Sequence, residues 1–123
     1  MHWSERWLGK PYAVLGRGPD AFDCLGLFMA VQNAEFGLSL DYGLVPKGPE
    51  EESVRARHAS GWQRVDVATE GCAVLMQRGR GWHIGVAIDA SRMLHAARPA
   101  SVIESFLGPK WGRRLEGVYA YVH

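Results

Sequence analysis

The side chains best suited to chemistry are one cysteine and two histidines, Cys24, His83 and His95. A thiolate is a strong nucleophile, an imidazole can take its proton near neutral pH, and a further polar group can hold that imidazole in one tautomer and orientation. The three residue types therefore predict nucleophilic catalysis by a cysteine, provided that the fold brings these distant segments together.

Cys24 lies where a loop is expected to become a helix. Residues 16–20 are Gly, Arg, Gly, Pro and Asp, which break regular structure, so the helix begins only after them. Apolar residues then recur at helical spacing and predict one buried stripe: Leu27, Phe28, Val31 and Ala34. Gly37 is expected to end the helix, and Asp20 or Asp23 can serve as its N-cap.

This position would place the sulfur of Cys24 at the positive end of the helix dipole, which favours thiolate over thiol. The alternative is that Cys24 is only a small apolar residue of a core helix, since free cysteines are among the most buried residue types. The helix start by itself supports both interpretations.

The two histidines lie in consecutive predicted strands. His83 shares a strand face with Gly85 and Ala87, whose small side chains leave room for something to approach. His95 follows twelve residues after His83. A tight hairpin turning at residues 90–91 would set the imidazoles opposite or diagonal to one another, with Cβ atoms about 5–8 Å apart.

A zinc site is the competing chemistry for the same side chains, with Cys72 as a conceivable fourth ligand beside Cys24, His83 and His95. A spacing of twelve residues lacks the short paired spacing of zinc fingers, which argues against it. Two cysteines are too few for a disulfide framework, and a Cys24–Cys72 disulfide is not expected.

The remaining elements indicate an α+β fold. Ser4 is expected to cap a short helix over residues 5–8, with Trp3 and Trp7 anchoring it on the core, and Pro49 to begin a second helix that ends before Gly61. Six short strands then follow at a spacing too close for parallel crossovers, so the curved sheet should be mainly antiparallel: residues 62–67, 72–77, 82–89, 92–96, 101–105 and 117–122.

The composition of the chain excludes several classes of function. The 123 residues are 47% hydrophobic and 22% charged, which predicts a single domain over 1–123. A net charge of +1 gives no broad basic surface for nucleic acid. The longest apolar run, residues 24–31, is too short to span a membrane, and the start has no secretory signal pattern, so we expect synthesis and folding in a reducing cytoplasm.

Taken in order, the segments Trp7–Tyr12, Phe22–Leu27, His83–Val86 and Met93–Ala96 resemble the NlpC/P60 family of papain-like cysteine peptidases, as does the closing segment 111–119. The likeness covers nearly the whole chain, and the cysteine and histidine motifs are specific in combination. It implies a papain-like fold in which N-terminal helices pack on the sheet. The chain looks most like the stand-alone versions found in phage tails, prophages and gene-transfer particles.

The resemblance implies hydrolysis of an amide in peptidoglycan stem peptides, commonly between D-γ-glutamate and a diamino acid, without a cofactor or metal. Cys24 would be the nucleophile, His83 the general base and acid, and His95 the group that orients His83. Tyr12, with the Cys24 backbone N–H, would bind the oxyanion, and Asp23 would contact substrate. Partners would be stem peptides and phage tail proteins, and the protein would be virion-associated or released to the cell wall.

Two positions depart from the family pattern. Leu25 stands where many members have Ser, and Gly71–Cys72 stands where many have Gly-Asp. The first weakens the transfer of substrate amine recognition to this chain, and the second leaves Cys72 without a role. A non-catalytic tail-assembly or wall-binding module on the same fold, and acyl transfer to an acceptor other than water, remain alternatives to hydrolysis.

Overall fold

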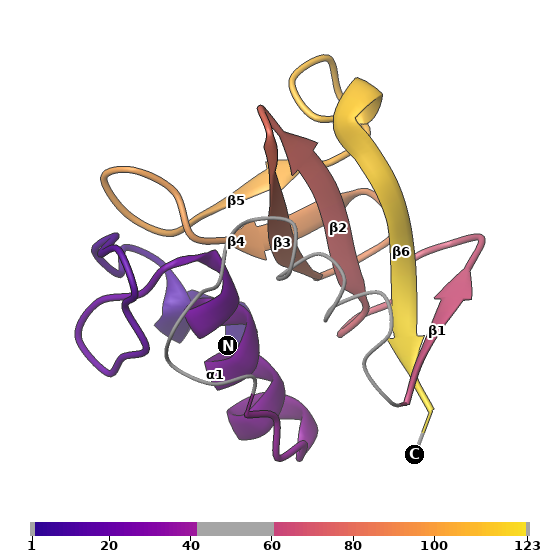
Figure 1. Ribbon diagram of the computed structural model, residues 1–123. Helices are drawn as coiled ribbons and strands as arrows, with labels where there is room; N and C mark the ends of the chain where they lie inside the picture. The colour runs from indigo at the N-terminus through magenta and orange to yellow at the C-terminus, as the bar shows by residue number, and fades with distance from the viewer. Residues whose placement is uncertain (1, 42–60, 123) are drawn as a thin grey trace.

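The computed structural model describes residues 2–41 and 61–122. A 3₁₀ helix η1 (Trp3–Trp7) and helix α1 (Cys24–Phe36) precede the strands (Figure 1). The strands are β1 (Trp62–Val65), β2 (Ala73–Arg78), β3 (Gly81–Ala87), β4 (Arg92–His95), β5 (Val102–Ser105) and β6 (Leu115–Tyr121), and the short 3₁₀ helix η2 (Gly112–Arg114) precedes β6. They form one sheet in the order β1-β6-β2-β3-β4-β5, and every neighbouring pair is antiparallel. The expected α+β fold with an antiparallel sheet is confirmed.

The two faces of the sheet bury different clusters. Helix α1 packs against β3 and β4, and its apolar residues share a cluster with Leu75, Ile84 and Val86 (Figure 1). The alternate residues of the same strands, such as Met76 and Ala87, belong to a second cluster with Trp111. Side chains at successive strand positions point to opposite faces, which explains the two sets.

Helix α1 begins and ends as the sequence indicates. Asp23 is the N-cap, with its Oδ1 accepting a hydrogen bond of 2.7 Å from the backbone N–H of Gly26. Gly37 ends the helix in the left-handed conformation at φ 72°. The prediction of a single buried stripe was wrong, because residues 24–29 are all buried. The loop before the helix covers its outer side, where a Cβ on Gly26 would lie 2.0 Å from the carbonyl oxygen of Gly16.

The first helical segment differs from its prediction in type and in cap. It is a 3₁₀ turn capped by His2, whose Nδ1 accepts from the backbone N–H of Ser4. Ser4 therefore lies inside the turn, and its buried hydroxyl contacts the same ring nitrogen at 2.7 Å. Trp3 and Trp7 pack on the core as expected, edge-on to Phe36 and Phe22 respectively.

The helix predicted from Pro49 onward lies outside the described residues. Among the residues that are described, no helix has the length and apolar content needed to cross a bilayer.

Candidate active site

His83 and His95 lie in direct contact. The Nε2 atom of His83 is 2.6 Å from Nδ1 of His95, with the two ring planes nearly perpendicular. The β3–β4 register pairs Val86 with Leu94 and Ala87 with Met93, so its continuation sets His95 diagonal to His83. The diagonal arrangement expected from the hairpin is confirmed.

The space at Gly85 is filled by the protein itself. A Cβ there would lie 2.9 Å from the sulfur of Met93 and 3.2 Å from the Cβ of His95. The room expected at position 85 is therefore occupied by side chains of β4 and is not open to another molecule. Gly85 instead allows His95 to come close enough to β3 to reach His83.

Glu104, which the sequence analysis missed, completes the contact. Its Oε1 lies 3.1 Å from Nε2 of His95. Glu104 is paired with Met93 in the β4–β5 register, two residues along β4 from His95. Glu104 lies within the predicted strand 101–105, and a carboxylate on the strand after His95 can lie beside that histidine. The strand register that brings Glu104 next to His95 could not be predicted from the sequence.

Trp111 holds the two imidazoles from the other side. Its ring is stacked on His83, with centroids 5.3 Å apart and planes 10° apart, and it meets His95 edge-on at 5.6 Å. Both imidazoles are almost fully buried. Burial, and then the charges of His95, Arg78 and Lys110, hold the pKa of His83 well below its ordinary value. Burial also lowers the pKa of His95, against the opposing effect of Glu104.

One nitrogen of the pair has no hydrogen-bond partner in the described part of the chain. Nδ1 of His83 is buried, and within residues 2–41 and 61–122 nothing accepts from it or donates to it. A buried polar atom without a partner is costly, and native proteins keep few of them. This ring nitrogen is therefore the atom of the pair that can serve a reacting group.

Cys24 is the first residue of α1 and belongs to the cluster on the helix side of the sheet, together with Ile84. His83 precedes Ile84 in β3, so its side chain points to the other face of the strand. There His83 pairs with Met76 and its ring is stacked on Trp111. Only residues 86 and 87 of β3 pair with β4. The part of β3 that carries His83 pairs with β2 alone. The structure thus brings the two histidines together, and it places Cys24 in the core cluster that also contains Ile84, the residue after His83 in β3.

Asp23 and Tyr12 are both engaged within the protein. Besides capping α1, Asp23 accepts a hydrogen bond of 2.5 Å through Oδ2 from Arg17, and its side chain is 11% exposed. The Tyr12 ring is half-buried beneath the guanidinium of Arg98, which lies 4.3 Å from the ring centroid. Their predicted roles toward substrate stay predictions.

The described residues contain no group of three His, Cys, Asp or Glu side chains arranged to hold a metal ion. Neither Cys24 nor Cys72 is part of a disulfide. Cys72 lies in the cluster on the face opposite α1, where its sulfur accepts a hydrogen bond of 3.4 Å from the backbone N–H of Thr69.

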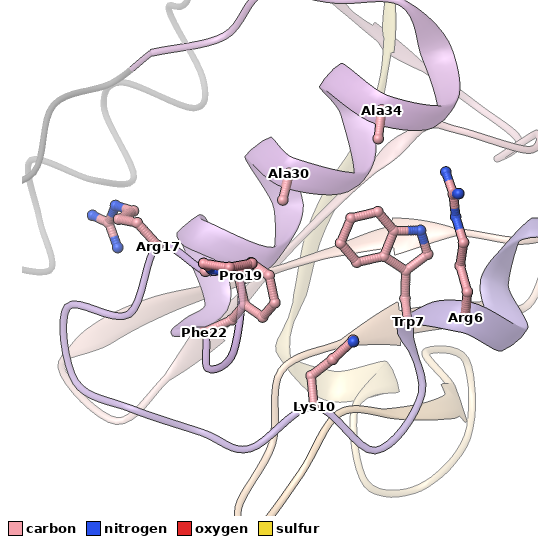
Figure 2. A pocket seen from close by; sticks show the side chains of 9 residues that line it. Arg6, Trp7, Lys10, Arg17, Pro19, Phe22, Ala30 and Ala34 are labelled. Atoms are coloured by element: carbon pink, nitrogen blue, oxygen red, sulfur yellow. The ribbon is translucent and has the colours of Figure 1, made fainter.

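A separate cavity of about 620 Å³ lies between the N-terminal segment and the outer side of α1 (Figure 2). Trp7, Phe22 and Ala30 form its apolar wall, and Arg6, Lys10 and Arg17 add positive charge. Arg6 is paired with Glu35 and Arg17 with Asp23, whereas no carboxylate within the described ranges is paired with Lys10. Neither histidine lines this cavity, so it is distinct from the imidazole pair.

Comparisons with known proteins show the family. The model of the NlpC/P60 family matches residues 9–119. A Listeria grayi protein named "Probable endopeptidase p60" is 30% identical over 115 residues, which are 93% of this chain and 20% of that protein. This chain therefore spans about a fifth of the length of that relative.

Two solved structures share the fold. An NLP/P60-family lipoprotein-like protein of Staphylococcus aureus superposes with a TM-score of 0.72 at 21% identity, covering 98% of this chain and 39% of that one. The NlpC/P60 domain of the peptidoglycan hydrolase SagA gives 0.68 at 20% identity, covering 95% of this chain and 92% of that one. With the family model matching from Gly9 to Tyr119, this chain belongs to the NlpC/P60 family.

Proposed function

We propose that the protein is a cysteine peptidase that hydrolyses an amide bond in peptidoglycan stem peptides, with Cys24 as nucleophile. The observation that carries the proposal is the buried Nδ1 of His83, which has no hydrogen-bond partner among the described residues, in a ring whose other nitrogen contacts His95. Membership of the NlpC/P60 family supports it. So does the likeness to an endopeptidase and to a peptidoglycan hydrolase domain.

The chemistry follows from these groups. Nδ1 of His83 takes the proton of the Cys24 thiol, and the thiolate attacks the carbonyl carbon of the amide. The oxyanion is bound by the Cys24 backbone N–H and Tyr12, and the imidazolium then gives its proton to the leaving nitrogen, which breaks the C–N bond. Water attacks the resulting thioester with His83 as base, which releases the acid and restores the thiol.

The thiol and the imidazole would meet at the part of β3 that has no β4 partner. Helix α1 packs against β3 and β4, and Cys24 is already in one cluster with Ile84. His83 precedes Ile84 in the part of β3 that pairs with β2 but not with β4. The reaction requires the sulfur of Cys24 to come into contact with Nδ1 of His83, whose ring is stacked on Trp111.

The bond we propose is that between D-γ-glutamate and a diamino acid, which is the specificity that the family resemblance implies. We also propose that the protein acts with a phage or prophage tail, in the virion or after release to the cell wall. Leu25 follows the nucleophile in place of Ser, so recognition of the substrate amine must differ from that of members that carry the Ser.

Defined muropeptides test the proposal. Under reducing conditions the wild-type protein should release two fragments whose masses add up to the mass of the substrate plus one water. Cys24→Ala should lower the rate by at least about 10⁴-fold, because the thioester cannot form without the sulfur. Mass spectrometry of the products identifies the bond. Cleavage by Cys24→Ala at the wild-type rate would contradict the proposal.

The same experiment separates hydrolysis from binding alone. A non-catalytic wall-binding module would retain muropeptides without turnover, and iodoacetamide would alkylate its Cys24 no faster than a free peptide thiol. Cys72→Ser serves as the control for labelling, since that thiol is buried at 3% exposure on the opposite face of the sheet.

A further inference from the structure

We propose that Glu104 is a positioning residue for the hydrolysis described above: its carboxylate fixes the tautomers of both imidazoles, so that His83 presents an unprotonated Nδ1. The inference rests on the proposed function for its kinetic consequence. Its structural consequence, the position of two protons, can be measured whether or not the protein turns over a substrate.

The hydrogen-bond pattern follows from the donors available. An ionised carboxylate can only accept, so the contact of 3.1 Å between Glu104 Oε1 and His95 Nε2 requires the proton to be on Nε2 of His95. A neutral imidazole has one N–H, so Nδ1 of His95 must then accept. The proton in the contact of 2.6 Å therefore belongs to Nε2 of His83. Nδ1 of His83 is left with a lone pair.

The carboxylate is itself held in place and charged. Lys110 Nζ donates to its Oε1 and also lies 3.2 Å from Oε2, and the indole N–H of Trp111 approaches Oε2 at 3.4 Å. Partial burial alone would raise the pKa of Glu104, but the hydrogen bonds from Lys110 and His95 lower it below its ordinary value. Glu104 is thus ionised near neutral pH, as an acceptor must be.

The neighbours of Glu104 are also those of His83. Trp111 contacts the carboxylate through its N–H and stacks its ring on His83. Because one indole holds both ends of the contact, the orientation of His83 and the position of Glu104 are coupled through packing as well as through His95.

Two substitutions at position 104 distinguish this role from a structural one. Glu104→Ala removes the acceptor, so the proton of His95 can move from Nε2 to Nδ1. Nδ1 of His95 then no longer accepts a hydrogen bond from Nε2 of His83. We expect kcat to fall by about 10- to 100-fold with KM little changed, by analogy with the loss of a partner that orients a metal-binding histidine. Glu104→Gln keeps an acceptor oxygen and should restore kcat to within a few-fold of wild type.

The test combines kinetics with ¹⁵N NMR of the histidine rings. In the wild-type protein, the ¹⁵N shifts should place the proton on Nε2 of both His83 and His95. Glu104→Gln should preserve this pattern, and Glu104→Ala should lose it at His95. The matched control is Glu116→Ala, which removes a carboxylate that accepts a hydrogen bond from Tyr119 on β6, a strand separated from β3 by β2.

The result that would overturn the proposal is an unchanged His95 tautomer in Glu104→Ala, together with kcat equal to that of Glu116→Ala. An inactive wild-type protein would contradict the proposed hydrolysis instead, and the NMR pattern would still decide the role of Glu104. Urea unfolding of each variant shows whether the fold has been kept.

Discussion

The most informative residue in the molecule is His83, because its burial decides both its charge and its available nitrogen. The ring is 1% exposed and keeps one nitrogen without a partner in the part of the chain that the structure describes. The sequence could predict that a histidine lies here and that a second one lies diagonal to it. It could not predict Glu104 or Trp111, because these approach from a later strand and loop whose register depends on the folded sheet.

Burial of the two imidazoles predicts that stability depends on pH. The folded-state pKa values of His83 and His95 are lowered from 6.5, so below that pH the unfolded chain binds more protons than the folded one. The free energy of unfolding should therefore be highest above pH 6.5 and fall as the pH decreases below it. The slope should reach at most about 1.4 kcal/mol per pH unit for each histidine.

Urea denaturation at several pH values between 5 and 8 measures this dependence. His83→Gln should show a smaller slope, since only His95 then contributes. A free energy of unfolding that stays level across this range would contradict the prediction. The pKa of Asp89 is lowered to about 2, so its protonation changes the stability only at pH values below this range.

At the scale of elements, helix α1 shows which features the sequence determines locally. Asp23 and Gly37 are a cap and a stop by their own chemistry, and both were predicted. The extent of burial around the helix was not, because it depends on the loop that folds over Gly26. The cap of η1 was also missed, since a histidine ring accepts the hydrogen bond that a serine was expected to accept.

Gly26→Ala tests the contact between this loop and the helix. Alanine is the better helix former by about 1 kcal/mol, so in an open helix the change would stabilise. Here the added Cβ would meet the Gly16 carbonyl oxygen at 2.0 Å and Asp23 Oδ1 at 2.9 Å, and the backbone must move. We expect a net loss of about 1–3 kcal/mol in the free energy of unfolding, as for other overpacked sites.

Thermal and urea unfolding measure the effect. The matched control is Ala34→Gly on the exposed part of the same helix, which should cost about 1 kcal/mol from propensity alone. A Gly26→Ala variant at least as stable as wild type would show that the loop does not lie against the helix in this way.

At the scale of the whole molecule, distant segments are joined by a few buried polar bridges. Ser101, just before β5, donates its hydroxyl to the carbonyl of Trp7 at 2.6 Å and accepts from the backbone N–H of Lys10 at 2.8 Å. The sequence indicated helices on an antiparallel sheet, which was correct, but nothing in it pairs residue 101 with residues 7 and 10. Such bridges exist only after the strands are in register.

Ser101→Ala should therefore loosen the N-terminal segment. The substitution leaves a partly buried backbone N–H and a carbonyl without their partner, at a cost of about 1–3 kcal/mol. Hydrogen exchange at residues 7–10 should accelerate, and the urea midpoint should fall. Ser105→Ala at the exposed end of β5 is the control and should change the midpoint little. Equal effects from the two substitutions would contradict this account.

The parallel stack of Trp111 on His83 gives the molecule an optical reporter of its own. An imidazole that gains a proton becomes a cation on the face of an indole, and indole emission responds to such a charge. The sequence has five tryptophans. The difference between the emission spectra of wild type and Trp111→Phe therefore gives the emission of Trp111 alone. Emission alone, without label or substrate, can then follow the charge of the buried ring as acid is added.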